Sequence, residues 1–323
     1  MVEMYLGQRE QIAWVDEAGG YANLGANTMS ADGEVVGKNM ILTPDENQGY
    51  QEVLSAGADT REVEDLEVGP LQHRFTLTFT PVNWKFLLFT SFGTVVNSGT
   101  NPNFIHTFSL SNAVTSFTLE WAKRGSTNEV ITYTGCIITR VRIRWSKGTG
   151  DREGFITVET DCLAKSKVIG TTVTSLSAPT LDAFKFHHVK LTYAGSEFVE
   201  INSGELLIDN NIDESDSRYA NSTLSRTIDE PIPRKASYLF TMNINQKDSA
   251  FTQDFIDAVI VPSTNILEFI RTDTNDKVIF TFTKLFISSP NNPTNLDGIS
   301  TQDIVAQPLS VAPVINDQIQ TYF

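Results

Sequence analysis

Polar and apolar residues alternate with a period of two along much of this chain, as they do in β-strands that bury one face. In the stretch VRIRW, the side chains of Val141, Ile143 and Trp145 point to one face and the two arginines between them to the other. The pattern predicts sheets with one dry face and one face that meets water or a partner, and therefore an all-β protein. Other segments rich in Thr, Val, Ile and aromatic residues predict strands at 74–81, 116–123, 129–145 and 154–164.

Two segments have helical rather than alternating spacing of their apolar residues. The segment 83–93 (NWKFLLFTSFG) predicts a short helix, with Asn83 as its N-cap and Gly93 as its end. The segment 248–259 (DSAFTQDFIDAV) has the same character, and Asp248 is placed to cap it. One short helix is therefore expected in each half of the chain.

The two halves of the chain repeat each other in the order of their elements. The stretch LEWAKRGSTNEVIT, which begins at Leu119, returns as LEFIRTDTNDKVIF at Leu267, an offset of 148 residues. A second offset, of 165 residues, aligns Phe75 with Phe240 and brings the two helical segments into register. A period of about 150 residues is too long for a solenoid or propeller repeat, so the pattern predicts two whole duplicated domains.

We expect the first β domain to cover residues 1–175 and the second to cover 176–323, each with one short helix. The seam is small, polar and broken by a proline at 175–184 (SLSAPTLDAF). The first half carries an extra loop at 95–106 that the second half lacks. The proline-rich stretch 288–323 predicts an extended C-terminal arm, whose apolar content indicates that it is tied down, for example on a neighbouring subunit.

Charge and cysteine content narrow the class of protein. The net charge of −15 over 323 residues argues against a protein that grips nucleic acid through its phosphates. Cys136 and Cys162 lie in apolar, strand-like runs, which is typical of buried free thiols. The N-terminus has no signal-peptide pattern and no apolar run is long enough for a membrane span, so we expect a soluble protein made in the cytoplasm.

Catalytic and metal-binding motifs do not emerge from the sequence. The stretch that begins at Asp209 starts like a calcium loop, but Glu214 stands where such a loop needs glycine and Ala220 where it needs glutamate. His187 and His188 are adjacent, so in a strand they would point to opposite faces and could not share a metal. We therefore expect no enzymatic activity and no cofactor.

The order of these elements resembles the major tail tube proteins of long-tailed phages and related archaeal viruses. The resemblance rests on IAWVDEAGGYA near the N-terminus, then RFTLTFTPVNWKFLLFTSFG, SFTLEWAKRG, GCIITRVRIRW and GFITVETDCLAKS. In that family each domain is a β-sandwich or flattened barrel with one short helix. The resemblance implies a structural virion protein whose rings stack into a hollow tube that conducts viral DNA to the host. It implies a location in the virion tail, and tape-measure, terminator and baseplate proteins as neighbours.

For a two-domain member, the resemblance implies homotrimeric rings with pseudo-sixfold symmetry, in which duplicated domains supply matching interfaces. Duplex DNA would pass through the lumen without specific binding. Acidic residues at matching positions of both halves are candidates to face the lumen, although an outer loop or the contact between rings would suit them equally: Glu62, Glu64, Asp65, Asp229 and Glu230.

Contacts between subunits or between rings have their own candidates. The acidic stretches 45–52 and 209–220 could reach a neighbouring chain, and the arginines of the VRIRW region could be their charge partners or could line an exposed sheet face. The candidates are Asp45, Glu46, Asp209, Asp213, Asp216, Arg140, Arg142 and Arg144.

Other classes of protein remain open at this point. A tail terminator, a baseplate ring or a decoration protein would also be acidic, β-rich and non-enzymatic, and only assembly into long tubes separates them from a tube subunit. A carbohydrate-binding β-sandwich would need aromatic residues grouped on one exposed face, whereas Trp84, Trp121 and Trp145 fall in core-like patterns. A hydrolase of unknown type is the remaining alternative.

Overall fold

Antiparallel strands dominate the computed structural model of the chain, and they confirm the all-β class. In the described residues, the strands are accompanied by two α-helices, α1 (Met29–Asp32) and α2 (Lys85–Phe92), and by a short 3-10 helix, η2 (Phe186–His188). The structure describes residues 10–53, 65–100, 102–112, 115–148, 154–198, 201–213, 231–245, 260–261, 265–271, 276–291 and 301–318.

Six strands of the first half pair in one antiparallel series, which runs from the N-terminal strand to an edge formed by a long hairpin. In order of pairing they are β1 (Glu10–Asp16), β7 (Phe117–Lys123), β8 (Glu129–Ser146), β9 (Thr157–Ala164), β4 (Asp65–Thr80) and β3 (Lys38–Val53).

Six strands of the second half pair in a series with the same order. They are β11 (Val189–Tyr193), β18 (Asn265–Ile270), β19 (Lys277–Asn291), β20 (Thr301–Asp317), β16 (Ser237–Asn245) and β13 (Ile201–Asp209). Strand β11 therefore takes the place of β1, and each following strand takes the place of its counterpart. The two halves of the chain therefore share one strand order, whereas the division into two domains at residue 175 stays a prediction.

Individual residues follow the same correspondence. Phe75 of β4 lies between Pro44 of β3 and Cys162 of β9, and Phe240 of β16 lies between Leu206 of β13 and Ala306 of β20. The sequence repeat that aligned the two phenylalanines therefore corresponds to equivalent places in the two series of strands.

The remaining strands are short or lie beside these two series. They are β2 (Glu34–Val35), β5 (Gly93–Thr100), β6 (Asn103–Leu110), β10 (Ser166–Gly170), β12 (Ser196–Phe198), β14 (Ile212–Asp213), β15 (Ile232–Pro233) and β17 (Ile260–Val261).

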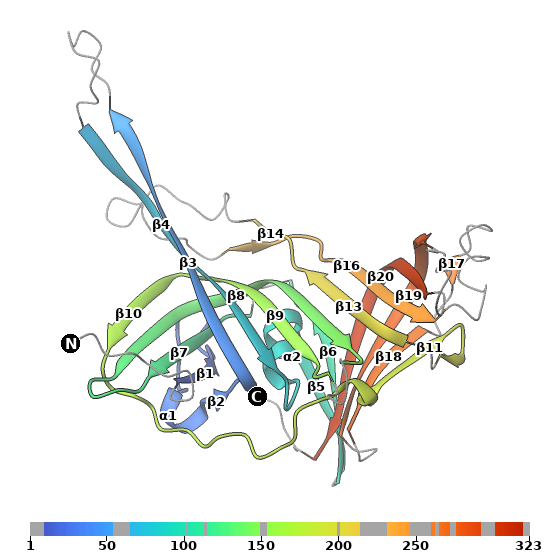
Figure 1. The fold of residues 1–323 in the computed structure, drawn as a ribbon. Coiled ribbons are helices and arrows are strands. Elements are labelled where there is room, and N and C mark those ends of the chain that lie inside the picture. The colour runs from blue at the N-terminus through green and yellow to red at the C-terminus, as the bar shows by residue number, and fades with distance from the viewer. Residues whose placement is uncertain are drawn as a thin grey trace.

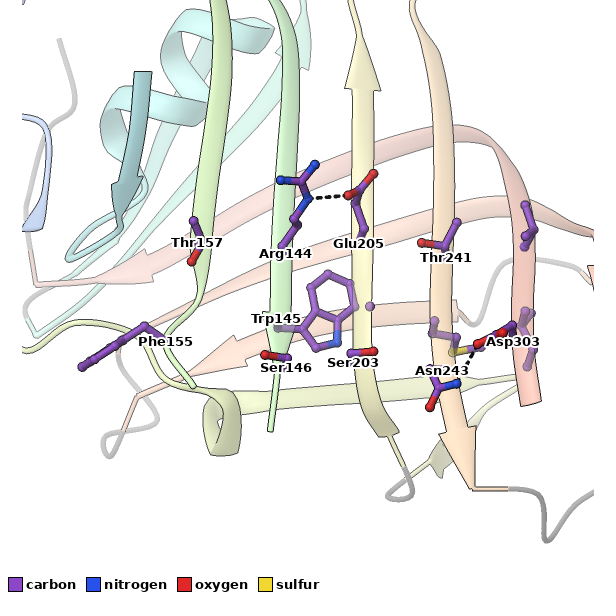
Figure 2. Close-up of a pocket in the computed structure, with 14 residues that line it drawn as sticks. Arg144, Trp145, Ser146, Phe155, Thr157, Ser203, Glu205, Thr241, Asn243 and Asp303 are labelled. Carbon is purple, nitrogen blue, oxygen red and sulfur yellow. Dashed lines mark hydrogen bonds and ion pairs between the residues drawn. The ribbon is translucent and has the colours of Figure 1, made fainter. Parts of the chain in front are cut away.

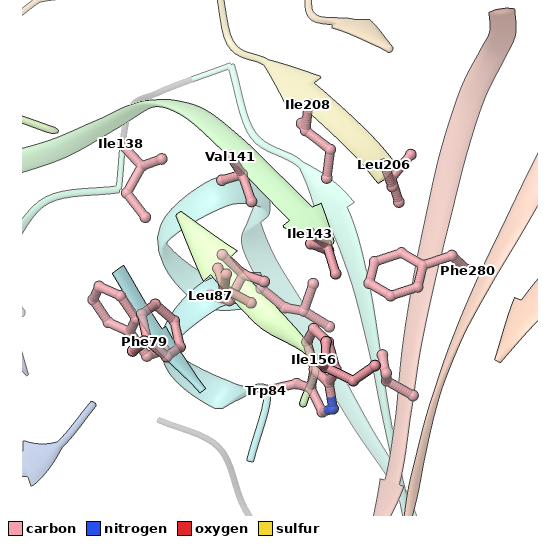
Figure 3. Close-up of a cluster of buried hydrophobic side chains, with 14 of the residues drawn as sticks. Phe79, Trp84, Leu87, Ile138, Val141, Ile143, Ile156, Leu206, Ile208 and Phe280 are labelled. Carbon is pink, nitrogen blue, oxygen red and sulfur yellow. The ribbon is translucent and has the colours of Figure 1, made fainter. Parts of the chain in front are cut away.

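The two halves join through strand pairing and through a shared core. Strand β8 of the first half pairs with β13 of the second, and β6 of the first half pairs with the end of β20. One cluster of buried apolar side chains contains residues of both halves. Figure 3 shows Trp84, Leu87 and Ile143 from the first half in this cluster beside Leu206 and Phe280 from the second.

Helix α2 confirms the helix expected in the first half. Phe86, Leu87 and Phe92 are buried along it, and Gly93 ends it with a φ of 89°, a conformation that favours glycine. The expected N-cap is wrong: Trp84, not Asn83, occupies that position, and its side chain makes no capping hydrogen bond. The helix expected at 248–259 lies outside the described residues.

Two expectations about irregular segments need correction. The segment 95–106 is not a loop but belongs to the hairpin of β5 and β6, whose eight registered pairs run from Gly93 opposite Leu110 to Thr100 opposite Asn103. Residues 301–317 are not an arm on a neighbouring subunit, because they form β20, which pairs with β19, β16 and β6 of the same chain. Ile304 and Ala306 of this strand are fully buried, so the apolar content of this stretch fills the chain's own core.

The hairpin of β3 and β4 is the most prominent projection of the molecule. Each strand has 16 residues, and their pairing extends from Lys38 opposite Thr80 to Val53 opposite Asp65. Figure 1 shows the hairpin extending far beyond the body of the molecule. Among the described residues, no helix has the length and apolar content needed to cross a bilayer.

Candidate assembly surface

A charged face lies on the side of strands β9, β8 and β13 that points away from the core. The alternation expected for VRIRW is confirmed, because Val141, Ile143 and Trp145 are buried whereas Arg142 and Arg144 are not. Register places Arg144 opposite Thr157 of β9 and Glu205 of β13. Figure 2 shows these side chains on adjacent strands, with Arg144 bonded to Glu205.

Arg140 lies at one end of this face and binds a carboxylate of the other half of the chain. Its Nε and Nη2 donate hydrogen bonds of 3.1 and 3.0 Å to Oδ2 of Asp209. Its Nη1 lies 4.0 Å from Oδ2 of Asp161 on β9. Thr76 of β4 donates a hydrogen bond of 3.1 Å to the other oxygen of Asp161, which extends the row to a fourth strand.

Glu159 of β9 joins the other two arginines. Its Oε1 accepts a short hydrogen bond from Arg142, and its Oε2 accepts one of 3.0 Å from Nη1 of Arg144. Arg144 also donates from Nε to Glu205, at 2.6 Å. This hydrogen bond raises the pKa of the Arg144 guanidinium, with partial burial opposing the shift and the charge of Glu159 adding to it.

We call the three arginines and the four carboxylates that they contact the charge ladder, because rows of opposite charge cross β9, β8 and β13 at successive polar positions. The ladder therefore contains one more carboxylate than it has guanidinium groups. Two of its ion pairs, Arg140–Asp209 and Arg144–Glu205, cross the junction between the halves. The ladder consists of Arg140, Arg142, Arg144, Glu159, Asp161, Glu205 and Asp209.

Polar side chains, most of them neutral, continue this face on both sides of the ladder. Thr78 of β4 lies opposite Glu159, and Thr241 of β16 lies opposite Glu205. Asn243 of β16 donates a hydrogen bond of 2.6 Å to Asp303 of β20, a pair that Figure 2 also shows. The face therefore spans the strands from β4 to β20 and carries its charges mainly in paired form.

The edge of the sheet at β3 carries two of the residues expected between subunits. Asp45 is exposed, whereas Glu46 accepts a hydrogen bond of 2.8 Å from Lys167 of β10 and lies 3.6 Å from His73. Partial burial alone would raise the pKa of Glu46, but the bond and charge of Lys167, together with His73, hold this pKa below its ordinary value. In the described part of the chain, β3 pairs only with β4, so its other edge is open to another strand.

The remaining expected residues are less informative. Asp213 pairs with Ile232 in the short β14–β15 ladder, and Asp65 is the first residue of β4, but their side chains are not described. Their roles, and those of the other lumen and contact candidates, stay predictions. Glu62, Glu64, Asp216, Asp229 and Glu230 lie outside the described residues.

The sequence singled out the three arginines and Asp209 as candidates for contacts between subunits or rings, not as partners within one chain, and it missed the other three carboxylates of the ladder. Glu159 and Asp161 alternate with buried residues in TVETD just as the arginines alternate in VRIRW. Opposite charges at the same period in neighbouring strands were the available signal. Glu205 had no such signal, because its partner strand comes from the other half of the chain.

The described ranges of the chain contain no group of three or more His, Cys, Asp or Glu side chains that could hold a metal ion. Cys136 and Cys162 are buried free thiols. Burial raises the pKa of both, that of Cys162 to about 12, so at neutral pH neither thiol ionises to the thiolate that acts as a nucleophile.

A comparison with protein families gives a match over nearly the whole chain. The model of a family described as "Phage tail tube protein" matches residues 7–312. A search of curated proteins finds no match.

Proposed function

Because this chain belongs to the phage tail tube protein family, a family of structural components of the virion tail, we propose that it is the subunit whose rings stack into the tail tube. In this proposal three chains form one ring, and their six similar halves surround a lumen through which viral DNA passes. Tape-measure, terminator and baseplate proteins would be its neighbours in the tail. The observation that carries the proposal is the junction between the two halves of one chain.

That junction shows how one half binds the next. The end of β8 in the first half pairs with β13 in the second, over seven residue pairs from Ser146–Ser203 to Arg140–Asp209. In the shared strand order, β19 takes the place of β8 and β3 takes the place of β13. A ring closes when the same contact is repeated between chains, so we propose that the end of β19 pairs with β3 of the next chain.

Both strands have room for this contact. Strand β3 pairs only with β4 in the described part of the chain. On one side, β19 pairs with β20 as far as Asn291. On its other side, the described strands β18 and β17 pair with β19 only as far as Phe286, so the residues after Phe286 have room for another strand there. Open edges of this kind are templates for pairing with another chain.

The internal junction also supplies a register for the contact between chains. Phe75 and Phe240 are equivalent, so the residues just before them, Arg74 and Leu239, are equivalent too. Asp45 pairs with Arg74 and Leu207 pairs with Leu239, so Asp45 of β3 takes the place of Leu207 of β13. Leu207 pairs with Arg142 of β8. Arg142 lies two residues after the β8 bulge at Ile138/Arg140, and Asn291 lies two residues after the β19 bulge at Ile287/Ser289, so Asn291 takes the place of Arg142. We therefore place Asp45 of one chain opposite Asn291 of the next.

With the sheets joined in this way, the polar face of β4, β9, β8, β13, β16 and β20 would line the lumen, and the apolar face would pack against the core. The projecting β3–β4 hairpin has the length to reach a neighbouring chain or ring. The inter-subunit or inter-ring role expected for the acidic stretches 45–52 and 209–220 is part of this proposal. So is the lumen role expected for Glu62, Glu64, Asp65, Asp229 and Glu230.

Covalent trapping tests the ring. A variant with Asp45→Cys and Asn291→Cys, bridged by a short bismaleimide, is expected to give covalent dimers and closed trimers on a denaturing gel. Each single variant is a control. It has one accessible cysteine per chain, because the native cysteines are buried, so the reagent can link no more than two chains and no closed trimer should form. Electron microscopy of the purified protein should show striated tubes. Single rings without stacks would instead favour a terminator or baseplate component, and absence of cross-linked chains in assembled tubes would refute the register.

A further inference from the structure

Arginines on a surface that faces moving DNA pose a physical problem. A guanidinium group binds phosphate oxygens with two parallel hydrogen bonds, and cationic walls hold duplex DNA through release of its counterions. The side chains of Arg140, Arg142 and Arg144 remain 42%, 26% and 46% exposed. They are therefore accessible to a phosphate group from the polar side of the sheet.

We propose that the carboxylates of the charge ladder hold these arginines away from DNA phosphates, so that the polar face lets duplex DNA slide. The inference rests on the proposed function, because it needs this face to line the lumen. It assigns the ladder a partner, the phosphate backbone of duplex DNA, and a role in preventing that partner from binding.

The geometry of the ladder supports this role. Each arginine already donates a hydrogen bond to a carboxylate, with Asp209 binding Arg140 and Glu159 binding both Arg142 and Arg144. A phosphate group would have to compete with these partners and would meet their negative charge. Because the ladder carries one carboxylate more than it has guanidinium groups, its net effect on DNA is weak repulsion.

The ladder also explains why arginines are present on this face. Arg140 and Arg144 each bind a carboxylate across the β8–β13 junction, so they link the halves of the chain. Bidentate and shared contacts of arginine fix strand positions more rigidly than single lysine contacts. Pairing each arginine with carboxylates keeps this link without producing a cationic wall.

Glu159 is the residue whose loss should expose the most positive charge, because it accepts hydrogen bonds from two arginines, whereas Asp161 lies 4.0 Å from its two arginines. In Glu159→Gln the amide keeps the shape of the side chain but removes its charge. The matched control is Glu197→Gln on β12. It also removes one carboxylate and frees one cation, because Glu197 pairs with Lys190 at 3.1 Å, but it lies outside the strands of the polar face.

The test is retention of a short fluorescent DNA duplex by assembled tubes in low salt, measured by co-sedimentation. Tubes of Glu159→Gln are expected to retain about tenfold more duplex than wild-type tubes, and the difference should vanish as salt rises, because phosphate contacts release counterions. Glu197→Gln tubes should behave like wild type. Equal retention by the two variants would overturn the proposal.

Two further measurements separate this inference from the proposed function. If wild-type protein forms neither rings nor tubes, the proposed function fails. If tubes form but their cryo-EM map places the ladder on the outer surface, the tube role stands and the sliding role is overturned. Where Glu159→Gln does not assemble, Glu205→Gln, which frees Nε of Arg144, takes its place in the same assay, and retention no greater than wild type then refutes the inference.

Discussion

Trp84 is expected to be one of the most sensitive positions for the stability of the whole chain. It precedes helix α2 in the first half, is 2% exposed, and stacks on Phe269 of the second half with ring centroids 5.0 Å apart. Phe184 and Phe280 meet the same indole edge-on at 5.5 and 6.1 Å. Replacing Trp84 with alanine would therefore open a cavity where the two halves pack together.

The size of the effect follows from two opposing contributions. Truncation of a buried tryptophan to alanine costs about 3–5 kcal/mol of unfolding free energy. The indole Nε1 of Trp84 is buried and has no hydrogen-bond partner in the described ranges, and leaving such a donor unpaired costs about 1–3 kcal/mol in the native protein. We therefore expect Trp84→Ala to destabilise the chain by about 3 kcal/mol, near the lower end of the range.

Trp84→Phe separates the two contributions. It keeps an aromatic ring against Phe269 and removes the unpaired N–H, so it should cost less than about 1.5 kcal/mol. Phe155→Ala is the surface control, because Phe155 is 46% exposed, and it should change stability by no more than about 0.5 kcal/mol.

Urea unfolding of subunits, followed by tryptophan fluorescence and by circular dichroism, measures these differences at conditions where the protein is not assembled. A cycle with Phe269→Leu should give a coupling of about 0.5–1.5 kcal/mol with Trp84. The reasoning is refuted if Trp84→Ala costs no more than Phe155→Ala, or if Trp84→Phe costs as much as Trp84→Ala.

Three further predictions concern other parts of the chain. Gly204→Ala should destabilise the β8–β13 junction by about 1–3 kcal/mol in urea unfolding, because the added Cβ would lie 2.4 Å from the ring of Trp145. Cys162, whose pKa burial raises to about 12, should react with iodoacetamide at neutral pH only after denaturation, as mass spectrometry can show. The pKa of Glu46 is lowered mainly by Lys167 against the effect of burial, so the stabilisation from this pair is complete above the ordinary pKa of 4.5 and is lost as pH falls through the lower native value. Glu46→Gln should abolish this part of the acid sensitivity, and an unchanged pH profile of unfolding would contradict it.

Local patterns predicted much of the secondary structure. The segment 129–145 became β8 (Glu129–Ser146), with its arginines on the polar side, because alternation alone decides which side chains share a face of a strand. Gly93 ended α2 as expected, since few other residues accept its positive φ. The N-cap was misassigned because Trp84 is held by packing in the core rather than by a capping hydrogen bond.

Non-local pairing accounts for the expectations that failed. The segment 95–106 and the stretch 301–317 each looked irregular or arm-like, yet β6 and β20 pair with each other across the two halves of the chain. Prolines in β20 discouraged a strand assignment, because proline lacks the N–H that a ladder uses. Pro313 of β20 nevertheless lies opposite Phe280 of β19 in the ladder between these two strands. A strand of this kind is stabilised by burial against neighbours that are distant in the sequence.

By itself the sequence determined the β class, the alternation of buried and polar side chains, the short helix of the first half and the repeated order of elements. These features depend on spacing within a few residues or on similarity between two halves of the same chain. Only the tertiary structure decided which strands are neighbours. It placed Glu205 beside Arg144 and joined the halves at β8 and β13. The physical reason is that the hydrogen bonds of a sheet and the ion pairs on its surface form between residues that are far apart along the chain.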